Sequence, residues 1–284
     1  MESGTKKLVT GCVVGCLIVM LIGVVLVFGG YLGVKKMIRQ AEETQRVMAQ
    51  VTAEFGRVSD FVPPPSGSIP GERVETFLEV RELCGPERDA LEMTLAQLSA
   101  AEESGGEDDG NPMDFARSVR AGVGVVPRMV SYTTRRNEAF LEAGMGLGEY
   151  LYLYTLIYGS WLEKPISDGP PFVVIGGDVS PDRWDDPAVR DRHVAAIRQR
   201  LNRTTLPMLR NQLQALTSRT DDGGVGWEES LRTEVMLMEA DPERLPWQDG
   251  LPQQTAESLT PYWEKLESSY SALCHPVELS VMQN

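Results

Sequence analysis

Residues 146–162 have the sequence GLGEYLYLYTLIYGSWL, in which apolar and aromatic side chains occupy nearly every side of a helix. At 100° per residue, four aromatic side chains fall within an arc of about 80°: Tyr150, Tyr154, Tyr158 and Trp161. A helix that is apolar almost all round is normally the buried centre of a bundle. The stretch therefore predicts a central helix, with Gly146 as its N-terminal cap, inside a helical domain.

Helical periodicity continues on both sides of this stretch. Val74, Phe77, Leu78 and Arg81 mark a first short helix that ends near Cys84. Further helical patterns begin at Pro86 and cover residues 112–143 with a break near Pro127, 186–216 with a kink at Pro207, 228–239 and 261–273. Phe172–Ile175 is the one convincing strand-like run, and one strand makes no sheet. We therefore expect an all-α helical bundle over residues 72–284.

The clearest boundary in the sequence precedes this domain. Residues 61–71 form a Pro/Gly/Ser-rich linker, and proline ends a helix because it lacks the amide hydrogen and fixes φ. Upstream, residues 35–60 are expected to form an amphipathic stalk helix. Its apolar seam has a heptad rhythm: Met37, Ala41, Thr44, Met48, Val51, Phe55 and Val58. The seam either packs on the chain's own domain or pairs with a second copy as a dimeric stalk.

Leu8 to Val34 is an uncharged run of 27 residues that follows a short tail, residues 1–7. As a helix it would extend about 40 Å, enough to cross the ~30 Å hydrocarbon core of a bilayer with some tilt. Lysine pairs at residues 6–7 and 35–36 mark its two interfaces. The run is too long for the core of a cleaved signal peptide, so we expect an uncleaved, single-pass transmembrane anchor.

Two pairs of glycines within the anchor have the four-residue spacing that lets membrane helices approach closely: Gly11, Gly15, Gly29 and Gly33. Together with the stalk seam they indicate a homodimer through anchor and stalk, although glycine is common in membrane helices anyway. The basic residues near the anchor favour a cytoplasmic C-terminal domain. A short tail before the anchor and a large domain after it are typical of the opposite orientation. We expect a cell-membrane protein with an extracytoplasmic domain.

Charge is unevenly distributed along the chain, whose net charge is −14. Residues 1–60 carry 7 Lys/Arg and 5 Asp/Glu, whereas residues 61–284 carry 20 and 36. A domain this acidic repels phosphate backbones, so we expect no nucleic-acid binding. The expected partners are the membrane itself and a protein or lipid that the sequence does not identify.

One basic helix interrupts the acidic domain. Residues 187–216 contain six arginines and a single acid, Asp191. Four of the arginines share one arc of a helix: Arg192, Arg200, Arg203 and Arg210. They either pair with the acidic surface of their own domain or form a binding face for anionic lipid headgroups or an acidic protein.

Motifs for catalysis or cofactor binding are missing from the sequence. Its two histidines, His193 and His275, belong to no cluster with metal-ligand spacing. There is no Gly-x-Ser-x-Gly elbow and no Walker A loop, and the acidic clusters lack the turn glycine and terminal glutamate of an EF-hand. We therefore assign no catalytic residue, and we expect no cofactor and no bound metal.

Charged residues gather where the helix ending at Ala143 meets the aromatic stretch. The set forms an expected buried aromatic and charged corner: Arg135, Arg136, Glu138, Glu142 and Glu149 beside Tyr150, Tyr154, Tyr158 and Trp161. Carboxylates buried together raise one another's pKa, which would suit a general acid/base pair. Such groups more often form ion pairs that fix a helix–helix corner.

Two cysteines, Cys84 and Cys274, lie in the domain. On the extracytoplasmic side they could form a disulfide that closes a loop of about 190 residues and constrains the unfolded chain. Taken together, the sequence predicts a non-enzymatic, membrane-anchored domain that binds or scaffolds a partner at the membrane surface. The alternative is a membrane-tethered envelope hydrolase that uses the carboxylates between Arg135 and Glu149.

Overall fold

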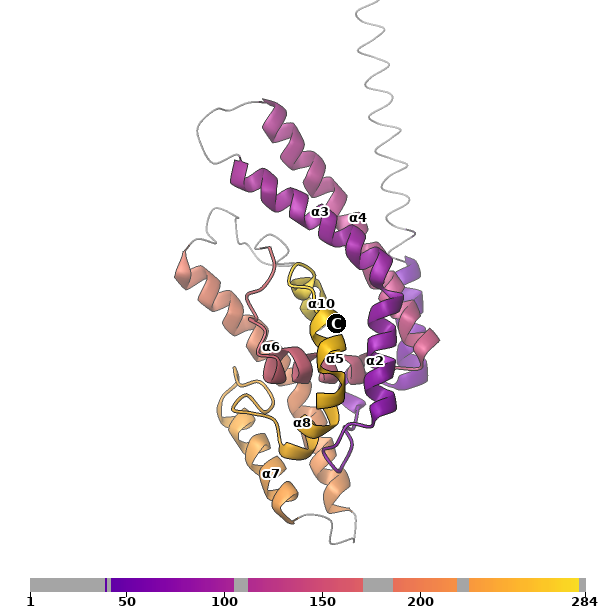
Figure 1. The fold of residues 1–284 in the computed structure, drawn as a ribbon, viewed down its shortest axis with the longest axis vertical. Helices are drawn as coiled ribbons and strands as arrows, with labels where there is room; N and C mark the ends of the chain where they lie inside the picture. The colour runs from indigo at the N-terminus through magenta and orange to yellow at the C-terminus, as the bar shows by residue number, and fades with distance from the viewer. Residues whose placement is uncertain (1–38, 40–41, 105–111, 171–185, 219–224, 281–284) are drawn as a thin grey trace, which may run out of the picture. The chain divides into compact units, whose positions relative to one another are not determined.

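The computed structural model describes residues 39, 42–104, 112–170, 186–218 and 225–280. The described residues form helices and no strand, which confirms the all-α prediction (Figure 1). None of these helices is both long and apolar enough to cross a bilayer. The expected anchor, Leu8 to Val34 with Gly11, Gly15, Gly29 and Gly33, and the strand-like run Phe172–Ile175 lie outside the described residues.

The chain divides into two units, residues 1–45 and 46–284. A helix over residues 42–55 leads into the second unit. The elements that follow it are η1 (Val58–Asp60), α2 (Gly71–Leu83), α3 (Gly85–Ser104), α4 (Pro112–Ala143), α5 (Leu147–Tyr154), η2 (Thr155–Trp161), α6 (Pro187–Thr217), α7 (Val225–Ala240), α8 (Gln253–Leu259), η5 (Thr260–Tyr262), α9 (Trp263–Ser268) and α10 (His275–Ser280).

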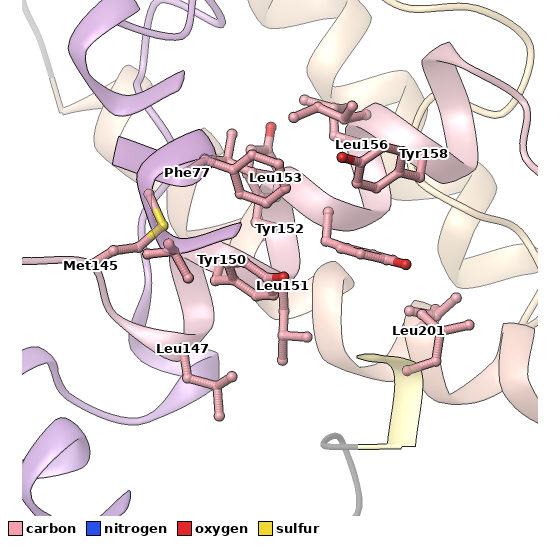
Figure 2. Packing of buried hydrophobic residues seen from close by; sticks show 14 of the residues in the cluster. Phe77, Met145, Leu147, Tyr150, Leu151, Tyr152, Leu153, Leu156, Tyr158 and Leu201 are labelled. Atoms are coloured by element: carbon pink, nitrogen blue, oxygen red, sulfur yellow. The ribbon is translucent and has the colours of Figure 1, made fainter. Parts of the chain in front are cut away.

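The aromatic stretch is the centre of the bundle, as its pattern predicted. Every residue of α5 except Glu149 is buried, and Tyr158 is fully buried in η2. Figure 2 shows Tyr150 and Tyr158 in this core beside Phe77 of α2. The stretch is not one α-helix, because it changes to a π-helix at Thr155. The Thr155 hydroxyl donates to the Leu151 carbonyl, 2.8 Å away, and such side-chain bonds bend helices.

Two glycines at the start of α5 let the preceding chain approach closely. A Cβ atom at Gly146 would lie 2.7 Å from Phe55 Cβ, and one at Gly148 would lie 2.6 Å from the Val58 carbonyl oxygen. Gly146 does stand at the N-terminal cap of α5, yet no side chain caps this helix. The glycines therefore serve packing more than capping.

The stalk and the linker pack on the domain over their described C-terminal part. Val51 of the seam is buried, and Met48 and Phe55 of the seam pack on the core. Val47, which lies beside the seam, is buried as well. The linker is hydrogen bonded to later helices: the Trp227 indole donates to the Pro65 carbonyl at 2.7 Å, and Thr255 Oγ1 donates to the Gly67 carbonyl at 2.6 Å. The contacts of residues 47–55 favour the reading in which the seam packs on its own domain.

Two long helices contain internal prolines without ending there. α4 continues through Pro127, so the expected break there does not occur, and α6 likewise continues through Pro207. On α6 the buried Asn202 side chain donates to three carbonyls at the end of α7: Met238, Asp241 and Arg244. This cap holds α7 against α6 and leaves the other side of α6 towards solvent.

Candidate functional site

The expected charged corner is divided between the surface and the core. Arg135 forms a two-pronged ion pair with Glu142, with Nη1–Oε1 at 2.7 Å and Nη2–Oε2 at 3.1 Å, and it also lies 3.5 Å from Glu138. The hydrogen bond from Arg135 lowers the pKa of Glu142, whose side chain is half exposed. A general acid needs the opposite shift.

Glu149 forms an ion pair with a different arginine, Arg73. Its Oε1 accepts from Arg73 Nε of α2 at 2.7 Å, and its Oε2 accepts from the same guanidinium. Glu142 and Glu149 are therefore each neutralised by a separate arginine and are not buried together. These contacts fit the interpretation as structural ion pairs that fix a helix–helix corner, and they do not bring the two carboxylates together as an acid/base pair.

The third arginine of the region, Arg136, points into the core and meets a residue that sequence reasoning missed. Arg136 Nη1 donates to Glu278 Oε2 of α10 at 3.0 Å, and Arg81 Nη1 of α2 donates to Glu278 Oε1 at 3.1 Å. The exposed fractions of the three side chains are 2% for Arg81, 0% for Arg136 and 2% for Glu278. We call Arg81, Arg136 and Glu278 the buried triad.

Aromatic residues complete the surroundings of the buried triad. The hydroxyls of Tyr132 and Tyr150 donate to Glu278, and the Arg81 guanidinium lies 5.1 Å from the centre of the Tyr158 ring. Burial would raise the pKa of Glu278, but the charges of Arg81 and Arg136 outweigh it and lower the pKa. Burial raises the pKa values of both tyrosines, so they remain hydrogen-bond donors. The arrangement holds an ionised carboxylate between two cations.

His275 lies beside the buried triad at the start of α10. Its Nδ1 is 2.8 Å from the Tyr154 hydroxyl, and its ring stacks on Tyr154 with centroids 5.7 Å apart. Burial lowers the pKa of His275 to about 4. Nε2 has no hydrogen-bond partner among the described residues. His275 is thus a neutral core residue.

The remaining corner residues are structural. Tyr150, Tyr154 and Tyr158 are buried, as expected, whereas Trp161 is only partly buried. Trp161 packs edge-on against the exposed Trp263 with ring centroids 4.9 Å apart.

The arginine face of α6 differs from the four-residue set read from the sequence. Arg210 is paired with Glu239 of α7, with Nη2–Oε1 at 2.6 Å. Arg192, Arg200 and Arg203 have no ion-pair partner within the described part of the chain, and Arg192 and Arg203 are exposed. We call these three residues the arginine face. Ile197, Leu201 and Met208 on the other side of α6 are buried, as the pattern predicted.

An acidic surface lies on α2. We define the acidic face as four exposed glutamates: Glu72, Glu75, Glu79 and Glu82. The last three line an open groove of about 460 Å³, whose other wall includes Lys265 and Ser268 of α9. Tyr262 donates a long hydrogen bond of 3.5 Å to Glu75. No arginine or lysine among the described residues forms an ion pair with this face.

The expected disulfide between Cys84 and Cys274 is not formed in the structure, which holds both as free, buried thiols. Cys274 Sγ lies 3.9 Å from the carbonyl oxygen of Arg88, and the Arg88 amide donates to the Cys84 carbonyl one turn away. Burial raises the pKa of each thiol to about 12, so both stay protonated and poorly reactive.

The described residues contain no group of His, Cys, Asp and Glu side chains placed to hold a metal ion. No family model, no curated protein and no solved structure matches this chain.

Proposed function

We propose that the protein is a single-pass membrane-anchored binding protein whose helical domain binds an acidic partner through the arginine face of α6. The observation that carries this proposal is three arginines, Arg192, Arg200 and Arg203, without a carboxylate partner in the described part of a domain rich in carboxylates. An unpaired basic face of this kind attracts an anionic surface and steers its approach.

The ion pairing of the carboxylates favours a binding function over catalysis. Glu142 and Glu149 are each held by a separate arginine, and Glu278 is held ionised by two. The pKa values of Glu142 and Glu278 are lowered, whereas a general acid requires a raised pKa. These three carboxylates, among the described residues, therefore give the hydrolase alternative no support.

The membrane part of the proposal is supported by the uncharged run from Leu8 to Val34 and its flanking lysines. We propose an extracytoplasmic domain. The native thiols of Cys84 and Cys274 are buried and would report topology poorly, so a new cysteine is needed. Ser230→Cys on the exposed face of α7 should react with a membrane-impermeant maleimide before the cell membrane is lysed. Reaction only after lysis would place the domain in the cytoplasm.

The binding part is tested with full-length protein in nanodiscs of neutral phosphatidylcholine. The probe is a fluorescent deca-glutamate peptide, which presents carboxylates without any specific sequence. We expect salt-sensitive binding that weakens on the order of tenfold in the triple variant Arg192→Gln/Arg200→Gln/Arg203→Gln, since each surface ion pair contributes ~0.2–1 kcal/mol. Equal binding by parent and variant would overturn the proposal.

A matched control removes three other exposed arginines, each already paired with its own carboxylate: Arg57→Gln/Arg210→Gln/Arg232→Gln. It has the same net charge as the test variant and should bind the peptide like the parent. Nanodiscs that contain phosphatidylserine separate the lipid alternative. An arginine-dependent contact with that lipid alone, without peptide binding, would show that the partner is the bilayer rather than a protein.

A further inference from the structure

We infer that the acidic partner is a second copy of this chain, whose acidic face on α2 receives the arginine face of α6. The inference rests on the proposed function, because it names the partner of the same arginines. Both faces belong to the described helical unit, and both lack an ion-pair partner there.

The two faces match in length. Arg192 and Arg203 are eleven residues apart, which places them about 16 Å apart along the axis of α6 at 1.5 Å per residue. Glu72 and Glu82 are ten residues apart, or about 15 Å along α2. Each face also occupies an arc of about 80° around its helix at 100° per residue. Two antiparallel or parallel helices can therefore place the three arginines opposite three of the four glutamates in one contact.

The acidic face is shaped to receive long side chains. Glu75, Glu79 and Glu82 line one wall of the groove, and a guanidinium entering it would meet carboxylates along α2. Lys265 on the opposite wall restricts a cationic guest to the α2 side. Arg88 in the same groove is already within 4 Å of its neighbours Asp89 and Glu92. The free negative charge of the groove is thus concentrated on α2.

The contact cannot form within one molecule. α2 packs on α3, α4 and α8, whereas α6 packs on α7 and η1, and Figure 1 shows α2 and α6 on opposite sides of the C-terminal helices. Each copy therefore offers one face of each sign to neighbouring copies, either to two different ones or reciprocally to one partner across a two-fold axis. The first of these is a head-to-tail contact, which propagates as an open chain unless the rotation between copies closes a ring.

Surface ion pairs are individually weak, and three or four of them would hold few free molecules together in dilute solution. Tethering changes this, because copies confined to one membrane meet at a high effective concentration. The inference therefore predicts an association that depends on salt and on the density of the protein in the membrane.

The experiment measures energy transfer between donor- and acceptor-labelled full-length chains in neutral phosphatidylcholine vesicles. One variant reverses the arginine face, Arg192→Glu/Arg200→Glu/Arg203→Glu. A second reverses the acidic face, Glu72→Lys/Glu75→Lys/Glu79→Lys. We expect each to lose at least two thirds of the salt-sensitive transfer, and we expect a chain that carries both reversals to recover it. A variant that reverses Arg57, Arg210 and Arg232 to glutamate is the control and should behave like the parent.

Energy transfer that ignores both single reversals, or that the doubly reversed chain does not recover, overturns the inference. Failure of the doubly reversed chain to recover the transfer is also the result we expect if the arginine face pairs with acids that precede α6 in the same chain: Asp178, Asp182 and Asp185. If transfer fails these tests while deca-glutamate still binds through the arginines, the proposed function stands with another acidic partner. A dimer held by the anchor alone would give transfer that high salt does not reduce.

Discussion

At the scale of single residues, Glu278 is the group on which two buried cations depend. Arg81 and Arg136 come from different helices, and the Glu278 carboxylate hydrogen bonds to both. Removing one partner of a buried ion pair leaves an uncompensated charge in a medium that solvates it poorly. The triad has two positive charges and one negative. The excess positive charge is stabilised by the aromatic rings beside the two guanidinium groups and by the Tyr150 hydroxyl oxygen, which accepts from Arg81.

Glu278→Gln should therefore reduce the free energy of unfolding by about 3–5 kcal/mol, because it preserves shape and removes the only negative charge of the triad. Urea denaturation of the full-length protein in detergent micelles, followed by tryptophan fluorescence, measures this. Glu142→Gln, whose side chain is half exposed and paired with Arg135, should cost less than about 1 kcal/mol. Equal losses in the two variants would contradict the assignment of Glu278 to a buried triad.

The lowered pKa of His275 predicts that the free energy of unfolding decreases in acid. Its pKa in the fold is about 4, below the ordinary value of 6.5, because burial disfavours the imidazolium. Asp168 and Glu278 act to raise this pKa and Arg81 to lower it, but burial outweighs them. Between pH 6.5 and 4 the unfolded chain thus binds a proton that the fold does not, and stability falls by roughly 3 kcal/mol over this window. His275→Gln should remove this component.

The measurement is the free energy of unfolding at several pH values for the parent and for His275→Gln. Carboxylates also titrate below pH 5, but they do so in both proteins. The two curves should run parallel above pH 7 and converge or cross as the pH falls to 5. Curves that stay parallel down to pH 5 would show that His275 is not neutral in the fold.

At the scale of elements, the start of α5 depends on the absence of side chains. Gly148→Ala would place a Cβ atom 2.6 Å from the Val58 carbonyl oxygen, a backbone atom that cannot move aside cheaply. We expect a loss of about 1–3 kcal/mol in unfolding free energy, as in other overpacked sites. Gly226→Ala in α7, where a Cβ would meet nothing within 4 Å, should be neutral or stabilise by up to ~1 kcal/mol. Thermal unfolding of both variants distinguishes the two sites.

The longer helices were predictable from sequence because each shows its own apolar period. By contrast, α8 and α10 were not predicted, and the helix expected over residues 261–273 ends at Ser268. The burial of Tyr150, Tyr154 and Tyr158 followed from a helix that is apolar on almost every side. The continuity of α6 through Pro207 was not predictable in this way, because tertiary packing on α7 outweighs the local cost of a proline. The change to a π-helix at Thr155 has no signal in a hydrophobic period.

The buried triad was only half visible in the sequence. Arg81 stands on the apolar face of its helix with Val74 and Phe77, which already marks it as a buried cation. Its partner Glu278 lies 197 residues away, and no local rule relates two positions so far apart. The individual partners in the charged corner were not predictable for the same reason, since Glu149 pairs with Arg73 and Arg136 pairs with Glu278, both on distant helices.

At the scale of the whole molecule, the start of the helical domain can be tested by truncation. The second unit begins at Arg46, and Val51 and the linker carbonyls are packed into it. A chain that begins at Arg46 should therefore melt within a few degrees of the full-length protein. A chain that begins at Gly71 loses Val51 and the hydrogen bonds to Pro65 and Gly67, and it should melt at least about 5 °C lower. Calorimetry of both fragments shows whether the folded domain begins at Arg46 or after the Pro-rich linker.

The distance in sequence between the members of the buried triad has a consequence for biosynthesis. A ribosome adds roughly 5–20 residues per second, so Arg81 leaves it about 10–40 s before Glu278 does. During that interval α2 and α4 each present a cation that their own packing would have to bury without compensation. The growing chain is thus held open, with both arginines hydrated, until α10 emerges. The closing of this core therefore waits for Glu278, the last member of the buried triad to be synthesised.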